Sequence, residues 1–191
     1  MQGNLPSGVM ESFAGRVNEM LHRYGPQPVT VIPCAASLAY HGLLGSVKEM
    51  VLFDVELTSV PAEQLVSLAS SVTDCVNIRN VSGCGLVTIL DSLKIQVLRF
   101  INQSLGSEET RAVVRAMESG VRSVWFREDS ILDIRALTEY DGQGKCSMVN
   151  CMNELGNRVR YREQLRTWGT SRNWNVVDNK TVIFMKRSVF G

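Results

Sequence analysis

The residues of this chain best suited to covalent chemistry are a cysteine and a glycine-bracketed turn. Cys34 follows the β-branched run 29–32 and opens a segment that contains Ser37 and His41. A thiol at the N-terminus of a helix can have a lowered pKa and act as a nucleophile. The sequence has only two histidines, His22 and His41, so most catalytic triads and histidine-based metal sites lack the side chains they need. A small α/β hydrolase or transferase would therefore depend on Cys34 or on the turn.

The turn is Gly83-Cys84-Gly85, between a β-branched run and an apolar helical segment. Backbone N–H groups at such a place can hold a phosphate. The turn lacks the third glycine and the acidic residue of a dinucleotide-binding loop, and no Gly-Lys-Ser/Thr follows it. A tight turn is the favoured interpretation. The enzyme alternative predicts a deep pocket at the carboxyl ends of the strands, lined by Cys34 or Gly83.

The remaining cysteines do not suggest a metal centre. Cys146 and Cys151 are separated by four residues, and no second Cys or His pair lies near them. Zinc sites need four such ligands, or three and a water. The sequence predicts neither a metal nor a cofactor.

Charge is distributed unevenly along the chain. Residues 1–144 carry 11 Lys and Arg against 16 Asp and Glu, residues 145–191 carry 9 against 3, and the net charge is +1. Five arginines and two tryptophans give the basic end a composition compatible with RNA binding: Arg158, Arg160, Arg162, Arg166 and Arg172, with Trp168 and Trp174. No RNP or KH signature accompanies them, and charge runs are usually solvated faces. RNA binding therefore remains an alternative, and nucleic acid is not expected as the main partner.

The composition is typical of one globular domain, with 191 residues of which 45% are hydrophobic and 20% charged. No run approaches the roughly 18 apolar residues of a transmembrane helix, so no membrane association is expected. The first residues have neither the basic nor the apolar region of a signal peptide. Five cysteines are compatible with reduced thiols. We expect a cytoplasmic protein.

Short β-branched or aromatic runs alternate with helix-period segments. Strands are expected at 29–32, 50–53, 76–81, 97–101, 121–126 and 148–151, and helices over 9–24, after Pro61, after Gly85, from Ser107 to Gly120 and from about Glu154 to Thr170. Strands that alternate with helices pair in parallel, because each crossover carries the chain back to the same end of the sheet. The fold class expected is α/β with a parallel sheet.

A period of 21 to 26 residues runs through this alternation. It fits the template L-x-x-L-x-L-x-x-N-x-L best in units that begin at Val47, Ile95 and Val121, and less well in units that begin at Pro26, Thr73 and Cys146. This pattern resembles the helix-containing leucine-rich repeats of ribonuclease-inhibitor type over about residues 26–156. The template asparagine, which satisfies the backbone where the strand bends into the loop, is replaced by Val55, Gln103 and Asp129 in the three clear units. A degenerate or flattened repeat is expected for that reason.

The segment from Leu57 to Trp174 also resembles repeat regions of vertebrate nucleotide-binding leucine-rich-repeat receptors. This resemblance implies a non-enzymatic protein-binding module in innate-immune or regulatory signalling.

The fold expected is thus a strand–helix repeat solenoid in one domain, residues 1–191. Residues 1–25 form an N-terminal capping helix, residues 26–156 the irregular repeats, and residues 157–191 a helix and a capping hairpin that turns at 178–180. The alternative is a doubly wound flavodoxin-like sheet. In such a sheet both faces are covered, so its strands should be unbroken apolar runs. The polar residues Asn77 and Arg99 between buried neighbours favour the solenoid, in which one sheet face is open.

The repeat register assigns side chains to the two faces of the sheet, because they alternate along a strand. Leu52, Ile78, Phe100, Phe126 and Cys151 should form one buried ladder. The opposite face, here called the open face, should carry the row Val51, Asn77, Arg99, Trp125 and Asn150 and the row Phe53, Arg79, Ile101, Arg127 and Met152. Trp, Arg and aromatic residues often dominate interface energies. We expect a protein partner to bind Phe53, Asn77, Arg79, Arg99, Ile101, Trp125 and Arg127, unless a helix or loop covers them.

Overall fold

The structure is a computed structural model of the chain and describes residues 29–30, 33–128, 130–141, 144–152, 158–178 and 182–187. The expected capping helix of residues 1–25 and the hairpin turn at 179–180 lie outside the described residues. The side chains of Cys34, Met152 and residues 29–30, 33, 158–162 and 182–184 also lie outside the described part.

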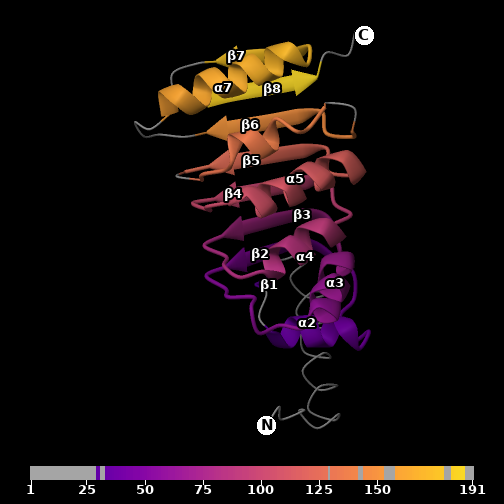
Figure 1. The fold of residues 1–191 in the computed structure, drawn as a ribbon. Helices are drawn as coiled ribbons and strands as arrows, with labels where there is room; N and C mark the ends of the chain where they lie inside the picture. Colours follow the sequence, from indigo (N-terminus) through magenta and orange to yellow (C-terminus); the bar gives the residue numbers. More distant parts are fainter. Residues whose placement is uncertain are drawn as a thin grey trace.

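Strands and helices alternate through the described part of the chain (Figure 1). The strands are β1 (Val29–Thr30), β2 (Val47–Phe53), β3 (Val72–Arg79), β4 (Val97–Ile101), β5 (Ser123–Arg127), β6 (Met148–Met152), β7 (Trp174–Asp178) and β8 (Val182–Arg187). The helices are α2 (Pro33–Tyr40), α3 (Ala62–Ser71), α4 (Gly85–Ser92), α5 (Ser107–Ser119), α6 (Ile134–Leu137) and α7 (Arg158–Ser171).

The eight strands form one open sheet in the order β1-β2-β3-β4-β5-β6-β8-β7. Each of the first five strands pairs in parallel with the next strand along the chain, and β8 then pairs antiparallel with β6 and with β7. The α/β class and the mostly parallel sheet are confirmed. A doubly wound sheet reverses its strand order at a switch point, and the parallel part of this sheet, β1 to β6, contains no such reversal.

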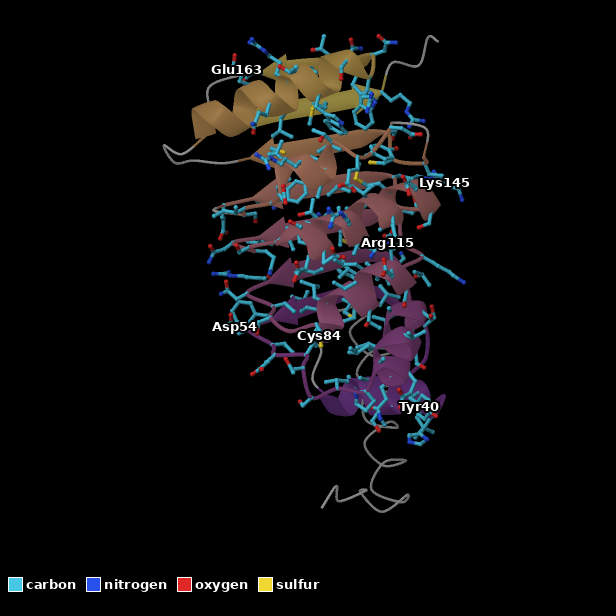
Figure 2. The ribbon with its side chains drawn as sticks, in the orientation of Figure 1. Tyr40, Asp54, Cys84, Arg115, Lys145 and Glu163 are labelled. Atoms are coloured by element: carbon cyan, nitrogen blue, oxygen red, sulfur yellow. The ribbon has the colours of Figure 1, made fainter. Side chains whose placement is uncertain are left out.

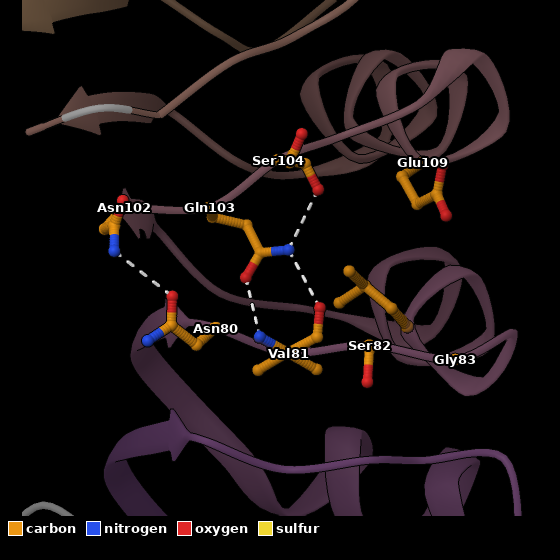
Figure 3. Close-up of a pocket in the computed structure, with 9 residues that line it drawn as sticks. Asn80, Val81, Ser82, Gly83, Asn102, Gln103, Ser104 and Glu109 are labelled. Carbon is orange, nitrogen blue, oxygen red and sulfur yellow. Dashed lines mark hydrogen bonds between the residues drawn. The ribbon is translucent and has the colours of Figure 1, made fainter.

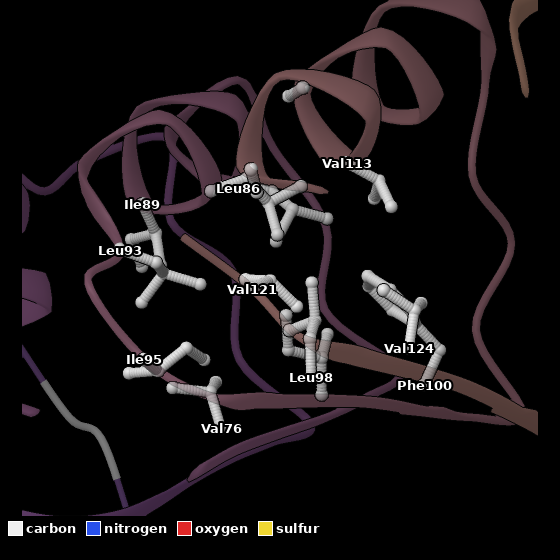
Figure 4. Close-up of a cluster of buried hydrophobic side chains, with 14 of the residues drawn as sticks. Val76, Leu86, Ile89, Leu93, Ile95, Leu98, Phe100, Val113, Val121 and Val124 are labelled. Carbon is white, nitrogen blue, oxygen red and sulfur yellow. The ribbon is translucent and has the colours of Figure 1, made fainter. Parts of the chain in front are cut away.

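The helices of the described residues lie along one side of the sheet, and each packs against the next (Figure 1). The core fills the space between the two layers (Figure 4). Strand residues such as Val76, Leu98 and Val124 meet helix residues such as Leu86 and Ile89, and all are at most 2% exposed. Burial of this one face of each strand, against one row of helices, produces the layered arrangement.

The predicted ladder is confirmed in both register and burial. Successive strand pairs match Leu52 with Ile78, Ile78 with Phe100, Phe100 with Phe126, and Phe126 with Cys151. The five side chains are between 0% and 7% exposed. Phe100 and Phe126 stack with their ring centroids 5.2 Å apart and an interplanar angle of 11°.

A left-handed residue follows four successive strands, which sequence reasoning did not identify. Asp54, Asn80, Asn102 and Glu128 come directly after β2, β3, β4 and β5 and have φ between 46° and 53°. Asn and Asp tolerate this conformation better than other non-glycine residues. Asn80 donates to Asp54 over 2.8 Å and Asn102 donates to Asn80 over 3.3 Å. The chain therefore leaves neighbouring strands by the same backbone bend.

Several element boundaries differ from expectation. β2 and β3 begin at Val47 and Val72, a few residues earlier than their apolar runs, β3 ends at Arg79 rather than at 81, and β5 begins at Ser123 rather than at 121. The last helix is described from Arg158, and residues 153–157, where its start was expected, lie outside the described residues. The short helix α6 was not predicted, and Asp133 caps it by accepting bonds from the N–H groups of Arg135 and Ala136. In the described part of the chain no helix has the length and apolarity needed to cross a membrane.

Candidate functional site

The Gly83-Cys84-Gly85 turn packs tightly against the preceding strand–helix unit. Gly83 has φ +95°, and a Cβ there would lie 2.6 Å from Thr58 Oγ1 and 2.9 Å from the Thr58 nitrogen. A Cβ on Gly85 would lie 2.8 Å from the Leu57 Cβ. Both glycines thus permit one unit to approach the backbone of the next. This close packing supports the structural interpretation of the turn.

A pocket of about 470 Å³ lies beside this turn, at the carboxyl ends of β3 and β4 (Figure 3). Amide, hydroxyl and carboxylate side chains line much of it, together with Val81, Gly83 and Leu86: Asn80, Ser82, Asn102, Gln103, Ser104 and Glu109. The enzyme alternative placed a pocket lined by Gly83 at this edge of the sheet, and that placement is correct.

The chemistry of the pocket does not fit a phosphate. The lining residues include Glu109 and no Lys, Arg or His. A carboxylate opposes an anion, and no lining side chain offers a compensating positive charge.

One pocket residue instead connects neighbouring units. Gln103 is 3% exposed. Its amide accepts from the Val81 nitrogen over 2.8 Å and donates to the Val81 and Ser104 carbonyl oxygens over 2.9 and 3.0 Å (Figure 3). Gln103 thus satisfies the backbone of the preceding strand–helix unit.

The described cysteines are free, and three of the four are buried: Cys75, Cys146 and Cys151. Burial raises the pKa of the Cys75 and Cys146 thiols to about 11 and that of Cys151 to about 12. Cys84 is exposed near the N-terminus of α4 (Figure 2). Within the described ranges, no group of three or more His, Cys, Asp or Glu side chains could hold a metal ion.

The basic helix α7 keeps its tryptophan inside the protein. Trp168, on α7, and Trp174, on β7, are 4% and 5% exposed and pack against each other with their ring centroids 5.7 Å apart. Tyr140 completes this cluster. Because neither indole ring is accessible, these tryptophans cannot stack on bases, and that part of the RNA-binding expectation is wrong.

The open face carries the seven residues expected at a partner site, in the register expected. Val51 pairs with Asn77, Asn77 with Arg99, and Arg99 with Trp125. In the second row the pairs join Phe53, Arg79, Ile101 and Arg127. No helix or strand of the described residues covers this face. The sequence left open that a helix or loop covers these side chains, and the described part of the chain contains no helix that does so.

The seven side chains differ in accessibility. Phe53 is 41% exposed and Arg127 is exposed, whereas Arg79, Arg99, Ile101 and Trp125 are half-buried. Asn77 is only 9% exposed. Its Nδ2 donates to Glu49 Oε1 over 2.6 Å. Asn77 therefore supports a neighbouring carboxylate rather than presenting a contact surface.

Arginines lie against the two aromatic rings of the open face. The Arg79 guanidinium lies 5.1 Å from the centre of the Phe53 ring, and that of Arg127 lies 5.8 Å from the Trp125 ring. The indole Nε1 of Trp125 donates to Ser123 Oγ over 2.6 Å. These contacts hold flat cationic and aromatic groups side by side, the arrangement in which cation–π attraction operates.

Sequence reasoning missed a third row on the same face. Glu49, Cys75, Val97, Ser123 and Met148 are paired across β2 to β6, two residues before the first row. Glu49 forms an ion pair with Arg99 over 3.7 Å. The period of two that identified the other rows would have found this one, had it been extended by one step.

Comparisons of the chain with protein-family models, with curated proteins and with solved structures found no significant match.

Proposed function

We propose that this chain is a degenerate, leucine-rich-repeat-like solenoid of ribonuclease-inhibitor type that binds a protein partner through its open face. Three features support the solenoid assignment. Strands β1 to β6 lie in the sheet in the order in which they follow one another along the chain, and the helices form a single row. The same left-handed residue follows each of β2 to β5. The template-like contacts of Gln103 add to this support. A role in innate-immune or regulatory signalling rests on the sequence resemblance alone.

One observation carries the binding proposal. The open face presents Phe53, Arg79, Ile101, Trp125 and Arg127 together, in two adjacent rows that no described element covers. Arg and aromatic side chains are the types that most often contribute strongly at interfaces. Apolar side chains that gather on an uncovered surface with polar residues around them are a feature of interaction sites.

The enzyme alternative has less support. The pocket beside Gly83 is lined by amides, hydroxyls and one carboxylate, and the buried thiols have raised pKa values, which leaves them protonated at neutral pH. A nucleophilic thiol needs a lowered pKa. The free state of the four described cysteines supports a reducing compartment, for which we propose the cytoplasm.

The binding proposal is tested by capturing proteins from a lysate with the intact chain, with and without nuclease, and measuring affinity for the purified captured protein. Trp125→Ala and Arg99→Ala should each weaken binding by about 2 kcal/mol. Val66→Ala and Arg135→Ala, which change exposed residues on the helices α3 and α6, should leave the affinity unchanged.

Circular dichroism must show that all four variants remain folded. Equal binding by the open-face variants and the helix variants would contradict the proposal, as would capture that disappears with nuclease.

A further inference from the structure

The open face and the helix layer differ in how their arginines are paired. Arg115 lies on α5 in the helix layer (Figure 2). It forms two bonds with the Asp91 carboxylate, of 2.8 and 3.0 Å, and Arg111, also on α5, pairs with Glu108 and Glu139. On the open face, Arg79 and Arg127 have no carboxylate partner among the described residues. Carboxylates thus pair with these arginines on the helix side of the sheet, whereas Arg79 and Arg127 on the open face form no ion pair with a described residue.

The negative charge on this face does not compensate for these arginines. Glu49 accepts a bond from Asn77 over 2.6 Å and lies 3.7 Å from Arg99. The Glu49 carboxylate therefore already interacts with Asn77 and Arg99. The three rows carry an excess of positive charge, because Glu49 is their one carboxylate against three arginines: Arg79, Arg99 and Arg127.

Arg79 is also partly desolvated. Its Nε atom is buried and has no hydrogen-bond partner, and its guanidinium lies against the Phe53 ring. A guanidinium removed from water gains more from an incoming carboxylate than a freely hydrated one does, because the local dielectric is lower. Stacking on the ring also reduces the side-chain entropy that pairing would cost.

The three residues of one row define a spacing. Arg79 pairs in register with Ile101, and Ile101 with Arg127, on three consecutive strands. Neighbouring strands lie about 4.8 Å apart, so the two arginines emerge about 9.6 Å apart with Ile101 between them. In a polyproline II helix, which has three residues per turn, side chains three residues apart lie on the same face and are about 9.3 Å apart. A peptide segment in this conformation that crosses the strands can therefore reach both arginines with side chains three residues apart.

We propose that the occupant of the open face is an acidic peptide segment of the partner in the polyproline II conformation. This inference rests on the proposed function and specifies its chemistry. Two carboxylates three residues apart pair with Arg79 and Arg127, and an apolar side chain between them packs on Ile101.

A nucleic acid fits the same face less well. Bases need accessible rings to stack on. Trp125 is half-buried, with its indole N–H bonded to Ser123 and Arg127 lying against its ring.

The test is a selection of random dodecapeptides displayed on phage against the intact chain, followed by affinity measurements with synthetic copies of the enriched peptides. We expect Glu or Asp three positions apart, with an apolar residue between them. The double variant Arg79→Gln, Arg127→Gln should weaken binding by about tenfold. The matched control Arg135→Gln, Arg166→Gln changes exposed arginines on α6 and α7 and should have no effect.

A charge reversal makes the test sharper. The variant Arg79→Glu, Arg127→Glu should reject the acidic peptides and bind copies in which Lys replaces the two acidic residues. A simple loss of folding cannot produce this exchange of specificity. Binding of the acidic peptides should also weaken as salt concentration rises.

The remaining outcomes separate this inference from the proposed function. Enriched peptides without acidic residues, whose binding Trp125→Ala abolishes, would overturn the acidic occupant and leave protein binding through the open face standing. Tighter binding of a uridine oligonucleotide than of any peptide would overturn the peptide occupant. If no peptide is enriched and no protein is captured from lysate, both proposals fail.

Discussion

Phe100 lies at the middle of the buried ladder, with Ile78 on one side and Phe126 stacked on the other. Its side chain is fully buried. Truncation to alanine would remove the ring and leave a cavity that the surrounding strands and helices cannot fully close.

Phe100→Ala should therefore lower the free energy of unfolding by about 3–5 kcal/mol, measured by denaturant titration. Phe53→Ala is the matched control, because Phe53 is 41% exposed on the open face. Its cost should stay below about 1 kcal/mol. Similar losses for the two variants would contradict the burial pattern.

The buried thiols should make the free energy of unfolding depend on pH in the alkaline range. Burial raises the pKa of Cys146 to about 11 and that of Cys151 to about 12, from an ordinary value of 9.0. As pH rises past that ordinary value, the unfolded chain loses these protons before the folded chain does. Ionisation therefore favours the unfolded chain, and stability present below the ordinary pKa falls as pH rises toward the folded values.

Between about pH 9 and pH 11, each of these two thiols should lower the free energy of unfolding by up to about 1.4 kcal/mol per pH unit. The measurement is denaturant unfolding across this range, for the native chain and for Cys146→Ala, Cys151→Ala. The double variant should be less stable than the native chain at neutral pH, and its free energy of unfolding should fall less steeply as pH rises. Equal slopes for the two proteins would show that other groups cause the pH dependence.

At the scale of elements, the turn before α4 controls how closely two strand–helix units pack. Gly83 has a positive φ and lies against the backbone of Thr58, so it cannot accept a side chain without movement of that segment. Gly83→Ala should lower the free energy of unfolding by about 1–3 kcal/mol.

Gly120→Ala provides the control. Gly120 ends α5 with φ −168°, a value open to any residue, and a Cβ there meets nothing within 4 Å. Thermal unfolding of the two variants should show a clear loss for Gly83→Ala and almost no change for Gly120→Ala. A neutral Gly83→Ala would mean that the turn is not a constraint on packing.

At the scale of the whole molecule, each described strand pairs only with its neighbours in the sheet, and each described helix packs against the next helix. In such an architecture stability is approximately a sum of terms within units and between nearest neighbours. The central strands β3 to β5 have paired strands on both sides, whereas β7 forms an edge of the described sheet.

Amide hydrogen exchange, followed by mass spectrometry, should therefore be slowest in β3, β4 and β5 and faster in β7. Phe100→Ala should speed exchange most in β3 to β5. Uniform protection across all strands, or uniform loss in the variant, would contradict nearest-neighbour stabilisation and indicate a single cooperative unit.

The sequence by itself determined the strand–helix alternation, the buried ladder and the face on which Arg99 and Trp125 lie. These features depend on local periods, because side chains alternate along a strand and a slip of one residue would invert every buried position. The sequence also predicted the hairpin of residues 174–187, because β-branched residues flank a turn sequence there.

Only the tertiary structure decided which side chains engage one another across units. Glu49 and Asn77 are 28 residues apart, and Gln103 and Val81 are 22 apart. No local period reports such contacts, which exist only when neighbouring strands are in register. Burial of Trp168 and Trp174 likewise depends on Tyr140, which a distant loop supplies. Accessibility is a property of the assembled layers, so residue type and spacing could place Trp125 and Asn77 on one face without showing that Asn77 is buried there.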